Sequence, residues 1–422
     1  MELNECIYSA NVPVKYVYEK AQILAPEENN YLVVVFSGFN APESTRQHSY
    51  NYMHALQPLV CVNRLYILDS YGPRGCYYIG NELKLDVESS VISLILWICR
   101  QNNIPWNHVI TAGSSKGGSA ALYFGLKYNV GHVVSGAPQI FIADYIKQTA
   151  PETLAYLIGS DLRQDRYNEL NNLILMQLDK PLYTAINILS SEHDWQYAHH
   201  IRPFMDILSA RSIPCCIKVD NTIGNHSEIG TYYPPYLQNY VLQLLYGFRI
   251  DGMQYSCDAT SLSADINASL PDDIQLKYSV YKGNSIVDSQ MCTQAQWRYV
   301  PAVDGIYQIR SSFFYKDQLI FESLSNQMPI GKNVLHISQA QLSNEGTRLN
   351  FFVDSEASGK LKYAFYVLKN GTVLEKHWYQ DSNTFTCDIR QYGSGKYCIQ
   401  YFILLEDGTK IIEKSNAVSI SV

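Results

Sequence analysis

Residues 111–125, TAGSSKGGSAALYFG, place Ser115 between two glycines that each lie two positions away. The pattern G-x-S-x-G is typical of a serine on a sharp turn between a strand and a helix, where its hydroxyl is exposed for nucleophilic attack. An apolar run, HVITAG, leads into this turn, and a helical pattern follows it. We therefore predict that Ser115, rather than Ser114, is a nucleophile. The alternative is that Ser115 only caps the helix.

A serine hydroxyl is a weak nucleophile without a neighbouring base. In enzymes with this turn, an acid and then a histidine follow the serine along the chain, on loops after later strands. Two later apolar runs are each followed by a polar loop, of which the first carries Glu192 and Asp194 and the second carries His226. We predict that His226 accepts the Ser115 proton and that Asp194 orients the imidazole. Glu192 is the alternative acid, because the sequence does not fix the turn of its loop.

The negative charge that develops on an acyl oxygen needs backbone N–H donors. We expect one donor to be the N–H of Lys116 and the other to be the N–H of Phe39, with Gly38 as the second choice. The Lys116 side chain is expected to meet an acidic substrate or to be solvated. Two loops after strand ends, on the side where α/β folds bind ligands, supply the candidate substrate pocket, namely Arg46, His48, Asn51, Arg74, Tyr77 and Tyr78.

The elements that must position these residues can be read from six apolar runs, each short enough for a strand and apolar enough to be buried on both faces. They are YLVVVF (31–36), RLYIL (64–68), HVITAG (108–113), HVVSG (132–136), TAINILS (184–190) and CCIKV (215–219). Helical patterns lie between and after them, at 87–101, 115–128, 168–178, 201–210 and 234–246. This alternation predicts an α/β fold, a mostly parallel sheet with helices on both faces. Segment 12–21 is predicted to be an earlier antiparallel edge strand.

Helical patterns end near residue 250, and short alternating segments follow, broken by Gly, Asn, Asp and Ser. Some of these segments recur about 90 residues later, a usual size for a small β-sandwich. Gly305-Ile306-Tyr307 matches Gly395-Lys396-Tyr397, and Ser325-Asn326 matches Ser415-Asn416. We predict a catalytic domain at 1–249 and two all-β Ig-like sandwich domains at 250–331 and 332–422.

Composition argues against several classes of protein. The net charge is −7 and the 32 Lys and Arg residues form no dense run, so nucleic acid is not an expected partner. The ten cysteines are scattered and form no C-x-x-C pair, which favours reduced thiols in a cytoplasm over disulfides or a zinc site. No metal-ligand spacing or phosphate-binding glycine loop is present, so neither a metal nor a resident cofactor is expected. Without a signal-peptide pattern or a long apolar stretch, the expected location is the cytoplasm, peripheral to the inner face of the membrane.

Four stretches together carry a resemblance to a known family. They are F-S-G-F at 36–39, D-x-Y-G-x-R-G-x-Y-Y-I-G at 69–80, the Ser115 turn, and N-H-S at 225–227. Through them the chain resembles the XcbB/CpsF family of capsular polysaccharide biosynthesis proteins and the hydrolase domain of the accessory-Sec glycan O-acetyltransferases. The resemblance implies an α/β-hydrolase fold and places the nucleophile, acid and base on Ser115, Asp194 and His226. The accessory-Sec relatives tend to use Glu as the acid, so Glu192 stays open.

The resemblance further implies an enzyme that moves an acyl group on a bacterial surface glycan through an acyl-Ser115 intermediate. The acyl donor would be a compound such as acetyl-CoA, and the partners would be the glycan, a membrane-associated biosynthesis complex and further copies of the chain. Two other functions stay open. One is a serine hydrolase acting on an unrelated ester or peptide, and the other is a non-catalytic assembly protein whose sandwiches bind glycan.

Overall fold

The computed structural model describes residues 4–22, 30–40, 48–258, 260–292, 295–331, 335–357, 360–406, 408 and 410–420. The chain folds into two compact units. The first unit comprises Met1–Arg249 with two short segments, Ser269–Ile274 and Phe313–Glu322, and the second comprises the remaining residues.

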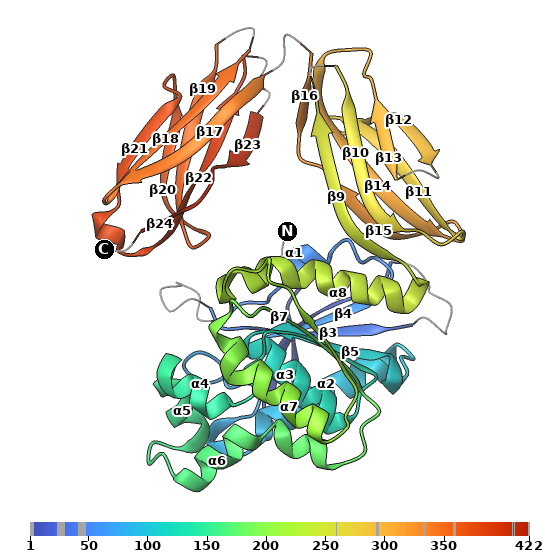
Figure 1. The fold of residues 1–422 in the computed structure, drawn as a ribbon, viewed down its shortest axis with the longest axis vertical. Helices are drawn as coiled ribbons and strands as arrows, with labels where there is room; N and C mark the ends of the chain where they lie inside the picture. The colour runs from blue at the N-terminus through green and yellow to red at the C-terminus, as the bar shows by residue number, and fades with distance from the viewer. Residues whose placement is uncertain are drawn as a thin grey trace. The chain divides into compact units, whose positions relative to one another are not determined.

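The first unit is built on an eight-stranded sheet in the order β1-β2-β4-β3-β5-β6-β7-β8 (Figure 1). All neighbouring strands from β4 to β8 are parallel, whereas β2 pairs antiparallel with both β1 and β4. The strand bounds are β1 Cys6–Ser9, β2 Pro13–Glu19, β3 Leu32–Phe36, β4 Asn63–Ile67, β5 Val109–Ser114, β6 His132–Gly136, β7 Ala185–Ser190 and β8 Cys215–Val219. This is the strand order of an α/β-hydrolase sheet, and the predicted fold class is confirmed.

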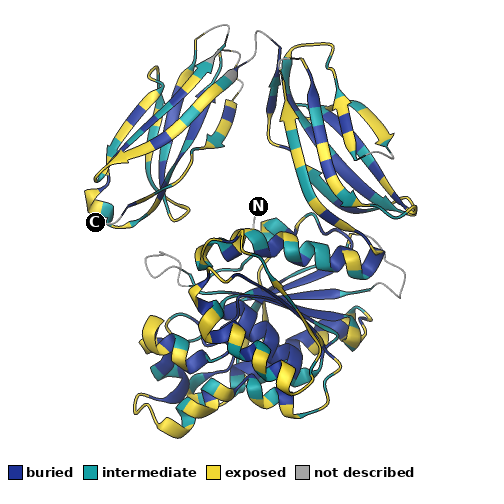
Figure 2. Cartoon of the chain, in the orientation of Figure 1, coloured by how far each residue is buried: buried dark blue, intermediate teal, exposed yellow. Residues whose placement is uncertain are grey.

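Helices cover both faces of this sheet. In Figure 1, α8 lies above the sheet and α3 lies below it, and both contact β5 and β6. The helices of the unit are α1 Met53–Leu56, α2 Asp86–Gln101, α3 Lys116–Tyr128, α4 Ile142–Thr149, α5 Pro151–Ile158, α6 Gln164–Asn172, α7 Arg202–Ala210 and α8 Ile229–Tyr246. The central strands are buried on both faces while the helices keep an exposed outer side, which places the core at the sheet (Figure 2).

Some predicted elements differ from the observed ones. The segment predicted as an edge strand forms β2, which is antiparallel as expected but is covered at its edge by β1. The run CCIKV forms β8, which is largely exposed because it pairs only with β7 along the sheet order. Helix α8 begins five residues before the predicted start, because Pro234 and Pro235 lie inside the helix instead of opening it.

The second half of the chain forms two pairs of antiparallel sheets with the same strand order. The first pair is β13-β10-β9 and β12-β11-β14-β15, with β16 on β14, and the second is β17-β18-β21 and β20-β19-β22-β23, with β24 on β22. The first set runs β9 Arg249–Cys257, β10 Leu262–Ser269, β11 Ile274–Lys282, β12 Ser285–Cys292, β13 Gln296–Tyr299, β14 Gly305–Tyr315, β15 Gln318–Leu324 and β16 Met328–Ile330. The second runs β17 His336–Glu345, β18 Arg348–Glu356, β19 Lys362–Lys369, β20 Thr372–Gln380, β21 Thr384–Asp388, β22 Gly395–Leu404, β23 Lys410–Lys414 and β24 Val418–Ile420. These sheets are those of two β-sandwiches.

The repeated sequence motifs have the same structural role in both sandwiches. The hydroxyl of Ser325 accepts the N–H of Ile309 at 2.8 Å, and that of Ser415 accepts the N–H of Ile399 at 2.9 Å. Ser325 thus joins β14, which carries Tyr307, to the chain after β15. Ser415 joins β22, which carries Tyr397, to the chain after β23. The internal repeat is therefore structural, while the exact domain boundaries at 249/250 and 331/332 stay a prediction.

Candidate active site

The backbone turns sharply at Ser115, between β5 and α3. Ser115 has φ 54° and ψ −124°, a positive-φ conformation that is costly for a residue with a side chain. A Cβ atom on Gly113 would lie 2.5 Å from the carbonyl oxygen of Gly117, so the close approach of strand and helix requires glycine there. The Ser115 N–H donates to the carbonyl of Gly136 at 2.8 Å, which ties the turn to the neighbouring strand β6. The sequence motif therefore forms the predicted turn.

The side chains of Ser115, His226 and Asp194 lie in one hydrogen-bonded series. His226 Nε2 is 3.0 Å from Ser115 Oγ, and His226 Nδ1 is 2.7 Å from Asp194 Oδ2. Asp194 is fully buried, whereas the His226 side chain keeps 23% of its surface exposed. Because a carboxylate can only accept, Nδ1 donates to Asp194, and Nε2 keeps its lone pair facing the Ser115 hydroxyl. The imidazole can therefore accept the serine proton.

The loop after β7 directs Asp194, and not Glu192, toward the imidazole. The second carboxylate oxygen of Asp194 accepts the N–H of Gln196 at 2.9 Å, which fixes the carboxylate within its own turn. Glu192 is exposed, and its carboxylate accepts from the side chain of Asn221 at 3.2 Å. The alternative acid is therefore not in contact with His226.

The loop after β3 brings the predicted oxyanion donors to the same region. The N–H of Gly38 already donates to the side-chain oxygen of Asn51 at 2.8 Å, so Gly38 has a partner. The N–H groups of Phe39 and Lys116 make no hydrogen bond with the part of the chain that the structure describes. Lys116 begins α3, where backbone N–H groups point out of the helix without partners. Among the described residues, the two predicted oxyanion donors are therefore backbone N–H groups without a hydrogen-bond partner.

The Lys116 side chain differs from the expectation that it meets substrate or solvent. It is 1% exposed, and its Nζ lies 2.6 Å from Oδ2 of the equally buried Asp69. The same carboxylate accepts the N–H of Cys76, at 3.0 and 2.9 Å from its two oxygens. The buried ion pair therefore joins the first residue of α3 to the loop after β4.

The predicted pocket residues have different environments. Tyr77 and Tyr78 are each 1% exposed and belong to the core, so they do not line an open pocket. Arg74 donates to the backbone carbonyls of Asn40 and Thr149, and its guanidinium lies over the ring of Phe39. Arg46 lies outside the described residues.

His48 is the predicted pocket residue that does line a cavity. This cavity of about 600 Å³ is also bordered by Tyr52 and Gly230, and the Tyr52 hydroxyl is hydrogen-bonded to the Ser114 hydroxyl. Burial lowers the pKa of His48. The cavity therefore adjoins the turn that carries Ser115.

Two buried glutamines that the sequence analysis missed reach the serine and the histidine. Gln139 Nε2 donates to Ser115 Oγ at 2.7 Å, and Gln196 Nε2 lies 3.2 Å from His226 Nε2. The two amides also contact each other, Gln139 Nε2 donating to Gln196 Oε1 at 3.2 Å. Gln139 follows the end of β6 and Gln196 follows the acid by two residues, so the rule that polar residues after strand ends gather at one edge would have found both.

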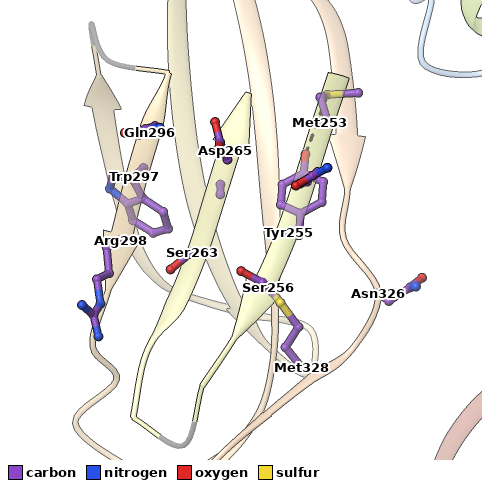
Figure 3. Close-up of a pocket in the computed structure, with 12 residues that line it drawn as sticks. Met253, Tyr255, Ser256, Ser263, Asp265, Gln296, Trp297, Arg298, Asn326 and Met328 are labelled. Carbon is purple, nitrogen blue, oxygen red and sulfur yellow. Dashed lines mark hydrogen bonds between the residues drawn. The ribbon is translucent and has the colours of Figure 1, made fainter. Parts of the chain in front are cut away.

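A cavity larger than the one beside His48 lies in the first sandwich and not beside Ser115. It measures about 900 Å³ and is bordered by residues of β9, β10 and β13, including Tyr255, Asp265 and Arg298 (Figure 3). Trp297, which also borders it, is 8% exposed and stacks on Tyr278 in the sandwich core. The volume of a cavity therefore does not by itself identify the candidate active site.

Two further observations concern metals and membranes. Within the described ranges, no group of three or more His, Cys, Asp or Glu side chains could hold a metal ion. Among the same residues, no helix combines the length and the apolar character needed to cross a bilayer.

Comparison with known proteins gives likenesses of fold alone. No family model matches the chain, and no curated protein matches it. A capsule O-acetyltransferase of Neisseria meningitidis serogroup A is similar at 25% identity, over 57% of this chain and 95% of that one, with a TM-score of 0.48. The Glycosylation Associate Protein complex of Streptococcus agalactiae is similar at 17% identity, over 56% of this chain and 45% of that one, with a TM-score of 0.46. A fluorophosphonate-binding serine hydrolase of Staphylococcus aureus follows at 12% identity, over 57% and 97%, with a TM-score of 0.44. Each TM-score is below 0.5, a level at which a likeness says nothing about activity.

Proposed function

We propose that the α/β unit is a serine acyl-transfer enzyme that works through a covalent acyl-Ser115 intermediate. The observation that carries the proposal is the series Asp194–His226–Ser115, with separations of 2.7 and 3.0 Å. An oriented imidazole next to a serine on a strained turn is what activates a hydroxyl that is otherwise a poor nucleophile.

In the proposed mechanism His226 takes the Ser115 proton while Oγ attacks the acyl carbon of the donor. The bond to the leaving group breaks, and His226 returns the proton to that group. The N–H groups of Phe39 and Lys116 stabilise the negative oxygen during attack. Asp194 keeps the imidazole in the required tautomer and stabilises its positive charge.

We further propose that the acceptor is a hydroxyl of a bacterial surface or capsular glycan and that the donor is an ester or thioester such as acetyl-CoA. Support comes from the four sequence stretches that resemble the XcbB/CpsF family. One is the Ser115 turn itself, and two others contribute His226, which contacts Ser115, and Asp69, which contacts Lys116. A cytoplasmic location and association with a membrane-bound assembly belong to the same proposal. Glu192 and the Gly38 N–H have no role in it.

A fluorophosphonate probe tests the proposal, because it reacts only with an activated serine. We expect the wild-type protein and Ser114→Ala to be labelled on a tryptic peptide that contains Ser115. Ser115→Ala and His226→Ala should remain unlabelled. Labelling of Ser115→Ala to the wild-type extent would overturn the assignment of the nucleophile.

A further inference from the structure

Two buried amides lie within hydrogen-bond distance of Ser115 Oγ and His226 Nε2. Gln139 and Gln196 are both 0% exposed. With Ser115 and His226 they close a ring of four contacts, from Ser115 Oγ to Gln139, to Gln196, to His226 Nε2 and back to Ser115. Buried polar side-chain atoms in native proteins mostly have at least one hydrogen-bond partner, and these contacts supply partners for both amides.

The orientation of both amides follows from the donors around them. The side-chain oxygen of Gln139 accepts from the Tyr77 hydroxyl at 3.3 Å and from the Ser119 hydroxyl at 3.2 Å. The nitrogen of Gln139 must then face Ser115 and the side-chain oxygen of Gln196. The nitrogen of Gln196 in turn faces His226 Nε2, whose lone pair can accept its N–H. Buried Tyr77 thus sets the direction of the whole chain of hydrogen bonds.

We propose that the Gln139–Gln196 pair keeps water from His226 Nε2 and so protects acyl-Ser115 from hydrolysis, which makes the site an acyltransferase and not an esterase. This inference rests on the proposed function. Once Oγ carries the acyl group, it has no proton left to donate to Nε2. The N–H of Gln196 then occupies the lone pair that a water molecule would need for activation.

Hydrolysis of acyl-Ser115 and transfer of its acyl group to a glycan form and break the same kinds of bond. The incoming hydroxyl oxygen bonds to the acyl carbon, the bond from that carbon to Ser115 Oγ breaks, and the hydroxyl proton passes through Nε2 to Oγ. Hydrolysis uses water, and transfer uses a glycan hydroxyl. To reach Nε2, either one must displace the Gln196 amide from its hydrogen bond. A bound glycan can offset that cost with contacts elsewhere on the protein, whereas a water molecule has no such contacts.

The cost of displacement gives the expected size of the effect. A buried hydrogen bond contributes about 1 kcal/mol net, and about 1.4 kcal/mol corresponds to a tenfold change in rate. Gln196→Ala removes the amide and opens space for water, so hydrolysis of the acyl-enzyme should become about fivefold faster. The rate of acylation does not enter this measurement, because the lifetime is counted after the acyl-enzyme has formed.

The test follows the acetyl-enzyme made with p-nitrophenyl acetate, by intact mass after rapid removal of the reagent and without an acceptor. We expect the acetyl adduct on Gln196→Ala to decay about fivefold faster than on wild type. Gln196→Asn keeps an amide but is one methylene too short to reach Nε2, so it should change the lifetime in the same direction. It also provides a milder variant if the alanine protein does not fold. Gln177→Ala, which removes a half-buried glutamine from another part of the same unit, should match wild type.

The outcomes separate this inference from the function on which it rests. If wild type forms the adduct but both Gln196 variants lose it no faster than wild type, the water-exclusion role is overturned and the acyl-enzyme stands. If wild type forms no adduct, the proposed function is overturned and this inference with it. A shortened lifetime in either Gln196 variant, with an unchanged one in Gln177→Ala, supports the inference.

Discussion

Lys116 Nζ and Asp69 Oδ2 lie 2.6 Å apart, and both side chains are almost completely buried. Lys116 is the residue that directly follows the proposed nucleophile, Ser115. Breaking such a pair leaves one charge buried without its partner, which costs about 3–5 kcal/mol. We expect Lys116→Met to lower the free energy of unfolding by this amount in urea denaturation. The pair therefore holds the start of α3 against the loop after β4.

A double variant separates the charge effect from simple loss of packing. Asp69→Leu combined with Lys116→Met removes both charges, so it should recover at least half of the stability lost in the single variant. Full recovery is not expected, because the N–H of Cys76 loses its acceptor. A double variant less stable than Lys116→Met would contradict this account of the pair.

The identity of the acid can be tested by two neutral substitutions in one loop. Asp194→Asn keeps the shape of the side chain but no longer fixes the imidazole tautomer, and such a change in a serine triad lowers kcat by about 10⁴-fold. Glu192→Gln should leave kcat unchanged, because Glu192 contacts Asn221 and not His226. The initial rate of p-nitrophenol release from p-nitrophenyl acetate, which reports acetylation of Ser115, compares both variants with wild type. The reverse ranking would assign the acid role to Glu192.

Backbone strain at Ser115 predicts a difference in stability between two inactive variants, Ser115→Gly and Ser115→Ala. Ser115 has φ 54°, a conformation that glycine adopts without penalty. Ser115→Gly should therefore be more stable than Ser115→Ala by about 1 kcal/mol, while both are inactive. Chemical denaturation of the two variants, side by side, provides the comparison. Equal stability would mean that the turn stores no strain.

Buried His200 predicts a dependence of stability on pH. Burial lowers its pKa to about 4, and its Nδ1 accepts the N–H of Phe141 at 3.3 Å. In the unfolded chain the pKa is about 6.5, so between pH 4 and 6.5 the unfolded state binds more protons than the folded state. The stabilisation is complete above about pH 6.5 and is lost as the pH falls through this window.

The control for that prediction is a neutral residue at the same position. The melting temperature of wild type should fall between pH 7 and pH 5, and His200→Gln should show a shallower fall. His193→Gln, at an exposed position, should keep the wild-type slope. Identical slopes for all three proteins would show that His200 does not contribute.

The fold and the reactive series were predictable because they follow local rules. Apolar runs buried on both faces predicted six strands of the sheet, and the glycine spacing predicted the turn at Ser115. The parallel sheet then brings the ends of successive strands to one edge, so chain order pointed to His226 and to the loop that carries Glu192 and Asp194. Their distances to Ser115 and to each other depend on loop geometry, which is why Glu192 could not be set aside.

The environment of the side chains around the series was not predictable in the same way. Tyr77 and Tyr78 follow a strand end, as pocket residues do, yet the backbone at both has positive φ and turns their rings into the core. The Lys116 side chain was expected to meet an acidic substrate or solvent, whereas it is buried against Asp69. Asp69 lies 47 positions away, and only the packing of α3 against the neighbouring loop brings the two together. Contacts of this kind depend on tertiary structure and leave no local pattern.

The intact mass of the protein after brief exposure to p-nitrophenyl acetate tests the central claim most directly. The account predicts one acetyl adduct on wild type, located on Ser115, and none on Ser115→Ala. No adduct on either protein, or an adduct of equal yield on both, would contradict the claim that Ser115 is an activated nucleophile.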